Sequence, residues 1–286
     1  MSSPIFYLLA ALLSLFFNFH GSKANFPASP NCPITKCSTN GLEFHYPFWK
    51  MEDSAVDHYC GYPGFGINCS DSGEPILGLP NKDSFYVRDI DFTLSTITLV
   101  DTDVVDQTCP RATHSMSVGT LPLDYSPLDV NLSFYFNCIS FPDPILVPPI
   151  TCWGIYSTNR SYVFKKGDEP DEFDWSENCA ENVVVTVKET EITGSINELS
   201  GAFGAAMNKG FVLNWTMAKE CGSCEINGGF CGYNNTAREV LCFCKDGHGS
   251  ISTPSNGLCH KGMILFLSLI PFLTSDIRGL LGLDKV

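Results

Sequence analysis

Apolar and polar residues alternate with a period of two over much of this chain. Between Val130 and Cys138 every second residue is apolar, and Asn131 and Asn137 lie on the intervening polar face. Because successive residues of a strand point to opposite faces, this pattern predicts a half-buried β-strand that exposes Asn131. Similar segments, rich in β-branched and aromatic residues, predict strands at 85–91, 96–100, 183–187 and 211–217.

Helical periodicity is scarce, and the best candidate for a helix is residues 195–208. Ile196, Leu199 and Phe203 have the spacing of one helix face, and Gly210 would end the helix. Prolines and glycines interrupt much of the remaining chain, as they do in the turns between strands. We therefore expect a mainly β fold.

The two ends of the chain carry long apolar segments. Residues 4–19 are almost entirely apolar and small residues precede Ala24, which predicts a secretory signal peptide, 1–24, that is cleaved. Residues 263–273 are also apolar, but as a helix they span only about 16 Å, roughly half of a bilayer core. We interpret 260–286 as a short apolar tail of a secreted, extracellular protein. The alternative is anchorage to a membrane through 263–273.

All 14 cysteines follow the expected cleavage site. In an exported chain, an even number at this density is typical of a disulfide framework, because an oxidising compartment preserves the bonds. The alternative is zinc, since Cys221-x-x-Cys224 and Cys242-x-Cys244 have the spacing of metal ligands. We favour disulfides and expect no metal site. The cysteines are Cys32, Cys37, Cys60, Cys69, Cys109, Cys138, Cys152, Cys179, Cys221, Cys224, Cys231, Cys242, Cys244 and Cys259.

The cysteines divide the mature chain into three blocks. Residues 25–110 contain five, 111–220 contain three and 221–259 contain six. An odd number in each of the first two blocks indicates either a bond that joins them or a misplaced boundary. We expect two small disulfide-rich β domains, 25–110 and 111–259, the second of which ends in the Cys-rich module 221–259.

Five Asn-x-Ser/Thr sequons agree with export, since each can accept an N-linked glycan at an accessible surface. One sequon alone would be weak evidence, but five of them beside a signal peptide and 14 cysteines form a consistent set. The expected N-glycosylation sites are Asn68, Asn131, Asn159, Asn214 and Asn234.

An ordered series of motifs occupies the first block. It begins with Cys32-Pro-Ile-Thr-Lys-Cys37, continues with Phe44-His-Tyr-Pro-Phe-Trp49 and reaches Cys60-Gly-Tyr-Pro-Gly-Phe-Gly-Ile-Asn-Cys69. In this order the motifs resemble the galacturonan-binding domain of plant wall-associated receptor kinases. The resemblance implies an extracellular domain that binds cell-wall pectin or another glycan.

The last block carries a second set of motifs, Cys221-Gly-Ser-Cys-Glu-Ile-Asn-Gly-Gly-Phe-Cys-Gly-Tyr233 and Leu241-Cys-Phe-Cys-Lys-Asp-Gly247. This set resembles the wall-associated kinase C-terminal domain of leaf-rust-resistance-type receptor-like kinases, and its last cysteines resemble the second half of an EGF-like module. The resemblance covers about 32–259 and implies a transmembrane helix and a cytoplasmic kinase. The chain has no Gly-rich loop with Val-Ala-x-Lys, no His-Arg-Asp and no Asp-Phe-Gly motif. We therefore expect an ectodomain without a kinase of its own.

Charge bears directly on the expected ligand. The chain has 31 Asp and Glu against 17 Lys and Arg, so it repels polyanions, and nucleic acid is not an expected partner. Residues 25–110 hold four basic residues and twelve carboxylates, which opposes a galacturonate polyanion. Three routes remain: a cationic patch of Lys36, Lys50 and Arg88, a calcium ion that bridges protein and sugar carboxylates, or a neutral or methyl-esterified glycan. We expect no resident cofactor.

Aromatic residues supply the third route, because the apolar face of a sugar stacks on a ring that is itself partly wet. The alternative is that these rings form a core beside the disulfides. Alternation sends Phe48 and Trp49 to opposite faces, so we expect one of them in the core and the other outside it. The aromatic candidates are Phe44, His45, Tyr46, Phe48, Trp49, Tyr62 and Phe65.

Catalysis has little support in the sequence. There is no Gly-x-Ser-x-Gly elbow and no His-Glu-x-x-His helix, although carboxylates are plentiful enough for a glycoside hydrolase. The acidic segment 168–174 lacks the glycine and terminal glutamate of an EF-hand loop, so we interpret it as a solvated loop. We expect a binding protein and not an enzyme. The alternatives are a secreted decoy or co-receptor that contacts a full-length receptor-like kinase, and a cell-wall glycoside hydrolase.

Overall fold

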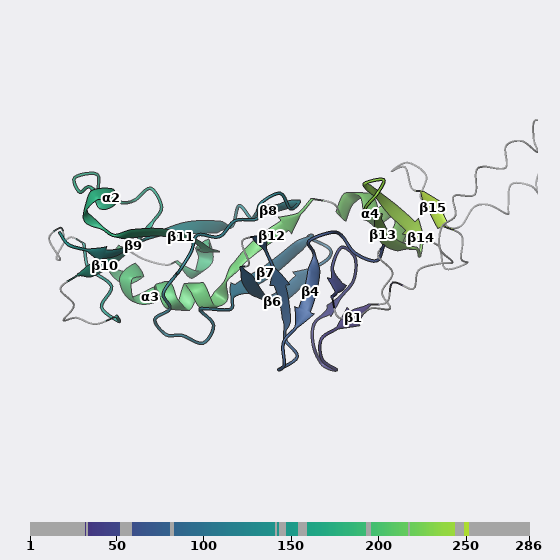
Figure 1. The fold of residues 1–286 in the computed structure, drawn as a ribbon, viewed down its shortest axis with the longest axis horizontal. Helices are drawn as coiled ribbons and strands as arrows, with labels where there is room; N and C mark the ends of the chain where they lie inside the picture. The colour runs from purple at the N-terminus through teal and green to yellow at the C-terminus, as the bar shows by residue number, and fades with distance from the viewer. Residues whose placement is uncertain are drawn as a thin grey trace, which may run out of the picture.

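A computed structural model shows an elongated molecule with small β-sheets along its length (Figure 1). The signal peptide expected at 1–24, the tail expected at 260–286, Cys244 and Cys259 lie outside the described residues. The mainly β, disulfide-rich fold expected from the sequence is confirmed. The structure describes residues 32, 34–51, 59–80, 83–140, 142, 147–153, 159–192, 196–216, 218–243 and 249–251.

The centre of the molecule is a seven-stranded sheet whose strands pair in the order β3-β4-β5-β6-β7-β12-β8. All pairs are antiparallel except β3 with β4. A short hairpin, β1 (Thr35–Lys36) with β2 (Glu43–Phe44), precedes it. The strands are β3 (Trp49–Lys50), β4 (Gly66–Cys69), β5 (Pro75–Gly78), β6 (Ser84–Asp91), β7 (Thr96–Asp101), β8 (Leu123–Tyr125) and β12 (Phe211–Trp215).

This sheet crosses the domain boundary expected at residue 110. Strands β8 and β12 lie beyond that boundary, yet β12 pairs with both β7 and β8 and completes the sheet. Leu213 and Trp215 of β12 are buried in the same core as Phe65 and Leu77 of the first block. The division into 25–110 and 111–259 remains a prediction about separately folding units.

A second, three-stranded sheet has the order β10-β9-β11. In the middle strand, Leu132, Phe134 and Phe136 face a core and Asn131 is exposed, as the period-two pattern predicts. Short helical turns α2 (Trp175–Asn178) and η2 (Glu189–Glu191) flank β11. The strands are β9 (Asp129–Cys138), β10 (Arg160–Lys165) and β11 (Glu181–Lys188).

Helix α3 (Ile196–Lys209) confirms the helix expected at 195–208. Leu199 and Phe203 are buried against the second sheet, so the apolar face of the sequence pattern is the packed face. Gly210 follows at φ 71°, and its N–H donates to the carbonyls of Ala206 and Met207. The chain then turns directly into β12.

Disulfide bonds occur in all three blocks of the described chain. Cys109–Cys152 joins the first two blocks, which accounts for the odd number of cysteines in each. The zinc alternative is wrong for Cys221 and Cys224, because both sulfurs are in disulfides. The six pairs are Cys32–Cys60, Cys37–Cys69, Cys109–Cys152, Cys138–Cys179, Cys221–Cys231 and Cys224–Cys242.

The Cys-rich module begins with a helix, α4 (Ala218–Ile226), followed by the sheet β13-β14-β15. Cys221 and Cys224 lie one helical turn apart, and each bonds to a different strand. In the part of the chain that the structure describes, no helix is both long and apolar enough to cross a bilayer. The strands are β13 (Phe230–Asn234), β14 (Glu239–Phe243) and β15 (Gly249–Ile251).

Asp129, at the start of β9, links the two larger sheets. Its Oδ2 accepts a hydrogen bond from the backbone N–H of Val212 in β12 at 2.8 Å. Its other oxygen is buried and has no hydrogen-bond partner among the described residues. Burial therefore raises the pKa of Asp129 from 3.8 to about 6, against the opposing effect of the Val212 hydrogen bond.

We expect Asp129→Asn to remove a pH dependence of stability. The folded state holds the Asp129 proton between about pH 4 and 6, where the unfolded chain has released it, so stability falls as pH rises through this window. The fall amounts to about 1–2 kcal/mol once solvent screening of this half-exposed group is allowed for. Urea unfolding at pH 4.5 and 7 should show a larger gain for the variant at pH 7. Parallel pH profiles of variant and wild type would contradict this assignment.

Candidate functional site

Three of the aromatic candidates are buried in the core of the seven-stranded sheet. Phe44, Phe48 and Phe65 are at most 1% exposed, and the ring of Phe48 packs edge-on against Trp215 with centroids 5.1 Å apart. A ring without a free face cannot stack on a sugar. The expectation that these three residues contact a glycan is corrected, because their rings pack within the core.

Trp49 and Tyr62 are half-buried and fix each other's position. Trp49 Nε1 donates a hydrogen bond to the carbonyl of Tyr62 at 3.2 Å, and its ring covers Gly61, where a Cβ would overlap it. The Tyr62 ring packs against Tyr233 of β13 with centroids 4.5 Å apart. As alternation predicts, Phe48 lies in the core and Trp49 lies at its edge.

The three cationic candidates do not act as one unpaired patch. Lys36 Nζ lies 3.3 Å from a carboxylate oxygen of Glu43, and Arg88 lies 2.6 Å from one of Glu74. Lys50 forms no ion pair within the described part of the chain. Lys50 is therefore the one of the three whose charge is not already balanced by a carboxylate of the described chain.

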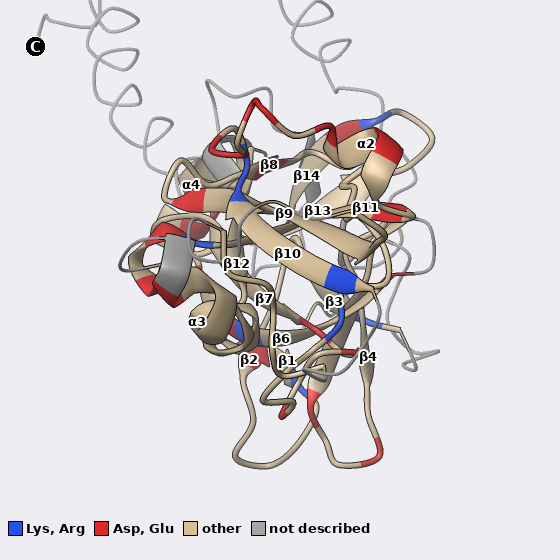
Figure 2. Cartoon of the chain, turned by 90° about the vertical axis from the view of Figure 1, so that its left-hand side faces the viewer, with Lys and Arg blue, Asp and Glu red and all other residues tan. Residues whose placement is uncertain are grey.

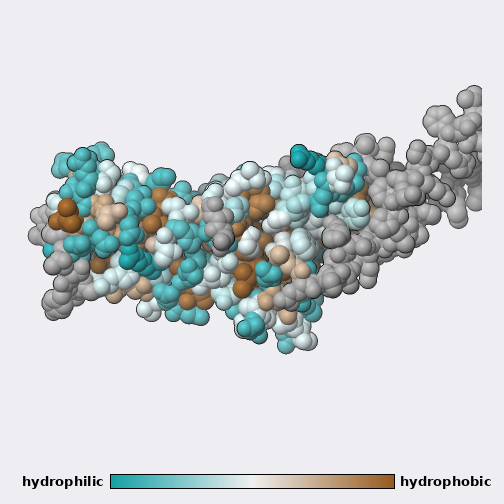
Figure 3. All heavy atoms as spheres, in the orientation of Figure 1, coloured by the Kyte–Doolittle hydropathy of each residue, from teal (hydrophilic) through white to brown (hydrophobic). Residues whose placement is uncertain are grey.

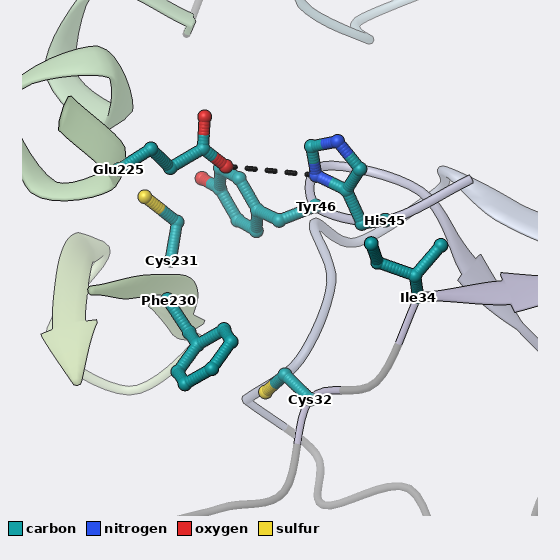
Figure 4. A pocket seen from close by; sticks show the side chains of 7 residues that line it. All are labelled: Cys32, Ile34, His45, Tyr46, Glu225, Phe230 and Cys231. Carbon is teal, nitrogen blue, oxygen red and sulfur yellow. Dashed lines mark ion pairs between the residues drawn. The ribbon is translucent and has the colours of Figure 1, made fainter. Parts of the chain in front are cut away.

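A cavity of about 140 Å³ lies between the first block and the Cys-rich module (Figure 4). Sites that enclose drug-sized ligands measure roughly 300–1,000 Å³, so this one matches a single sugar ring or side chain. The first block supplies one wall, and α4 with β13 supplies the other. The lining residues are Cys32, Ile34, His45, Tyr46, Glu225, Phe230 and Cys231.

His45 and Glu225 come from opposite walls of this cavity and approach each other, with Nδ1 and Oε1 3.5 Å apart. The His45 ring also stacks on Phe92 with centroids 3.8 Å apart, which fixes its orientation. Burial lowers the pKa of His45, and burial raises the pKa of Glu225. The lowered pKa of His45 favours its neutral imidazole, so the cavity carries little positive charge.

A second hollow of about 20 Å³ adjoins the cavity and shares Cys32, His45 and Tyr46 with it. Lys50 and Trp49 also line this hollow. Since one water needs about 10–15 Å³, this hollow has room for a water but not for a sugar. It places the unpaired cation Lys50 next to the cavity.

The Cys-rich module is docked on the first block through a shared core. The backbone N–H of Tyr233 donates to the carbonyl of Tyr59 at 2.7 Å. Tyr46 of the first block is buried in one cluster with Tyr233, Val240 and the module's cysteines. Beside this contact, Gly232 leaves no room for a side chain, because a Cβ would overlap Tyr59 O. This docking fixes both walls of the cavity.

The acidic segment 168–174 lies at the other end of the molecule, before α2, where Figure 2 shows acidic residues on the helix. Asp174 is the N-cap of α2 and accepts hydrogen bonds from the N–H groups of Ser176 and Glu177. Glu169 accepts one from Gly167 N at 2.6 Å. These carboxylates thus bind backbone groups of their own loop.

The five sequons differ in exposure. Asn68 and Asn131 are exposed, and Asn159, Asn214 and Asn234 are half-buried. The exposed pair meets the accessibility that glycosylation requires. Modification at all five sites remains a prediction.

Three cavity residues have no counterpart among the sequence candidates: Ile34, Glu225 and Phe230. Glu225 and Phe230 reach the cavity only because α4 and β13 dock on the first block. In the sequence, the spacing of Cys221 and Cys224, one helical turn, is the feature that could have predicted α4. Glu225 follows Cys224 directly, on the same turn of that helix.

Comparison with known families agrees with the motifs. Residues 32–101 match the family model described as "Wall-associated receptor kinase galacturonan-binding". Residues 151–247 match the model described as "Wall-associated receptor kinase C-terminal". Two segments of the chain are thus similar to domains of wall-associated receptor kinases, and the resemblance inferred from the sequence is confirmed.

The relatives are proteins of Arabidopsis thaliana. Leaf rust 10 disease-resistance locus receptor-like protein kinase-like 1.2 is 26% identical over 90% of this chain and 38% of its own length. Kinase-like 2.1 of the same series is 27% identical over 75% of this chain and 33% of its own length. The putative RING-H2 finger protein ATL21A is 25% identical over 85% of this chain and 62% of its own length. The chain spans about a third of the two kinase-like relatives. No solved structure matches the chain.

Proposed function

We propose that this protein is an extracellular, non-catalytic binding module for cell-wall pectin or its fragments. One observation carries the proposal: the only part matched to a galacturonan-binding family contributes His45 and Tyr46 to a cavity of sugar-ring size. The cavity combines apolar walls with one imidazole and one carboxylate. This is the mixture that binds a sugar, whose ring faces are apolar and whose edge carries hydroxyls.

The lining of the cavity supports binding without hydrolysis. A glycoside hydrolase places two carboxyl groups about 5–9.5 Å apart across the scissile bond. Among the described residues that line the cavity, Glu225 is the single carboxylate. A glycan held there would meet an acid without the second group that hydrolysis requires.

The test is binding of the secreted, glycosylated chain to pectic oligosaccharides in the presence of a calcium chelator. We expect saturable binding and no release of reducing sugar. Loss of all binding on chelation would instead assign the contact to a calcium bridge between sugar and protein carboxylates. Absence of binding to any pectic glycan, with or without calcium, would refute the proposal.

Phe230→Ala is expected to weaken binding to a pectic oligosaccharide about twofold to tenfold, since one stacked ring contributes about 0.5–1.5 kcal/mol. Phe230 is 39% exposed, so its loss should change stability little. Tyr125→Ala is the matched control, because Tyr125 is 40% exposed on β8 and lies outside the cavity. Calorimetric titration of both variants measures the effect. Equal losses in the two would show that Phe230 is not a ligand contact.

A second candidate is a decoy or co-receptor that contacts a receptor-like kinase, with no glycan involved. The observation in its favour is exposed apolar surface at the module junction, where Ile34 is 64% and Ile226 87% exposed. On the face shown in Figure 3, however, apolar residues form separate patches among polar ones in the described part of the chain. Capture of a full-length receptor-like kinase by the purified chain, abolished by Ile226→Ser but not by Leu128→Ser, would support this candidate.

A further inference from the structure

We propose that the cavity accepts an uncharged pectic sugar, a methyl-esterified galacturonosyl residue or a neutral sugar, and that Glu225 excludes the free uronate. This inference rests on the proposed function and names the ligand class for the same site. It also makes selectivity a property of the Cys-rich module, which lies outside the part matched to the galacturonan-binding family.

The charges in the cavity oppose a carboxylate ligand. Among the described lining residues there is one carboxylate, Glu225, one imidazole, His45, and neither lysine nor arginine. Glu225 lines this cavity of about 140 Å³, so a uronate bound in it would bring a second carboxylate close to Glu225. Two carboxylates at such distance repel, and the cavity supplies no lysine or arginine to offset the repulsion.

His45 does not reverse this balance. Its Nδ1 is already directed at Glu225 Oε1, 3.5 Å away, so its charge when protonated is matched by that carboxylate. Its ring is stacked on Phe92 and cannot turn towards a ligand without breaking that contact. Lys50, which forms no ion pair within the described chain, lines the adjoining small hollow and not the cavity itself.

The same residues suit an uncharged sugar. Ile34, Phe230 and Tyr46 give the cavity apolar walls for the C–H face of a ring or for an ester methyl group. The Glu225 side chain is 41% exposed, so its free oxygen can accept a hydrogen bond from a sugar hydroxyl. Hydrogen bonds to an ionised acceptor are among the stronger ones in proteins. Glu225 therefore attracts a hydroxyl and repels a carboxylate at one position, which is how a site gains specificity.

Disulfide bonds fix the position of the helix that carries Glu225. Glu225 lies on α4, which two disulfides bond to β13 and β14. Phe230, on the same wall of the cavity, begins β13. The backbone that carries Glu225 is therefore fixed beside β13, so the carboxylate stays within reach of a ligand in the cavity. The repulsion of a charged ligand therefore follows from the position of α4.

The test is a calorimetric titration of the whole secreted chain at pH 7 with a calcium chelator. The probes are one oligogalacturonide in two forms, fully methyl-esterified and saponified to the same length. We expect the wild type to bind the esterified form about tenfold or more tightly, as repulsion at a partly exposed site allows. Glu225→Gln should improve binding of the saponified form about tenfold and weaken binding of the esterified form severalfold, because an amide oxygen is a weaker acceptor than an ionised carboxylate.

Glu177→Gln is the matched control, because it removes the same charge from the exposed side of α2 at the far end of the molecule. It should leave the preference unchanged. If both variants improve saponified binding equally, the net charge of the protein decides and the inference fails. A wild type that binds both forms equally also overturns the inference but leaves the proposed function standing. If neither form binds, the proposed function itself fails.

Discussion

Gly232→Ala is expected to weaken ligand binding more than tenfold by separating the two walls of the cavity. Gly232 is buried in β13, and a Cβ there would overlap the carbonyl oxygen of Tyr59 and lie 2.7 Å from the Phe243 ring. The adjacent hydrogen bond from Tyr233 N to Tyr59 O, 2.7 Å long, would have to lengthen or break. Overpacking of this kind costs about 1–3 kcal/mol, and we expect it to appear as more than tenfold weaker binding to a pectic oligosaccharide.

The control for this prediction is Gly222→Ala in the same module. Gly222 lies within α4 and a Cβ there meets nothing within 4 Å, so alanine should stabilise the helix by about 0.5–1 kcal/mol. Its binding should equal that of the wild type. If Gly232→Ala binds as well as Gly222→Ala, contact between the first block and the module is not needed for the site.

Gly210→Ala should produce the largest loss of stability, because it affects the turn that joins α3 to β12. Gly210 has φ 71°, a conformation that costs an L-residue about 1–2 kcal/mol. A Cβ there would also overlap the carbonyl oxygen of Leu99 in β7. Together these effects should lower the free energy of unfolding by about 2–5 kcal/mol, measured by urea denaturation.

Gly201→Ala, in the middle of α3, serves as the comparison for Gly210. Nothing lies within 4 Å of a Cβ at Gly201, so we expect a gain of about 0.5–1 kcal/mol. A loss below 1 kcal/mol for Gly210→Ala would mean that the turn can adjust. In that case the packing of α3 against both sheets is looser than the structure indicates.

The sequence predicts the local elements well because their patterns are local. Alternation from 130 to 138 places Leu132, Phe134 and Phe136 in the core of β9, where the structure has them. The spacing of Leu199 and Phe203 predicts the buried face of α3, and Gly210 predicts its end. In each case the side chains that share a face are close in sequence.

The candidate site is less predictable, because it depends on contacts between distant segments. Alternation separates Phe48 from Trp49, but it does not say that Phe44 and Phe65 also turn inward. No motif in the first block predicts that Glu225 belongs to the site. Glu225 lies far along the chain and comes near His45 only because the module docks on the first block. Composition signals an acidic protein. Only the structure shows that one carboxylate lies in a cavity without lysine or arginine.

The most direct measurement is hydrogen–deuterium exchange of the secreted chain with and without a methyl-esterified oligogalacturonide. The account predicts slower exchange in two separate segments, the backbone from Ile34 to Trp49 and the backbone from Cys224 to Tyr233, because both line one cavity. Protection confined to the first segment, or to the acidic end around α2, would contradict a site shared between the first block and the Cys-rich module.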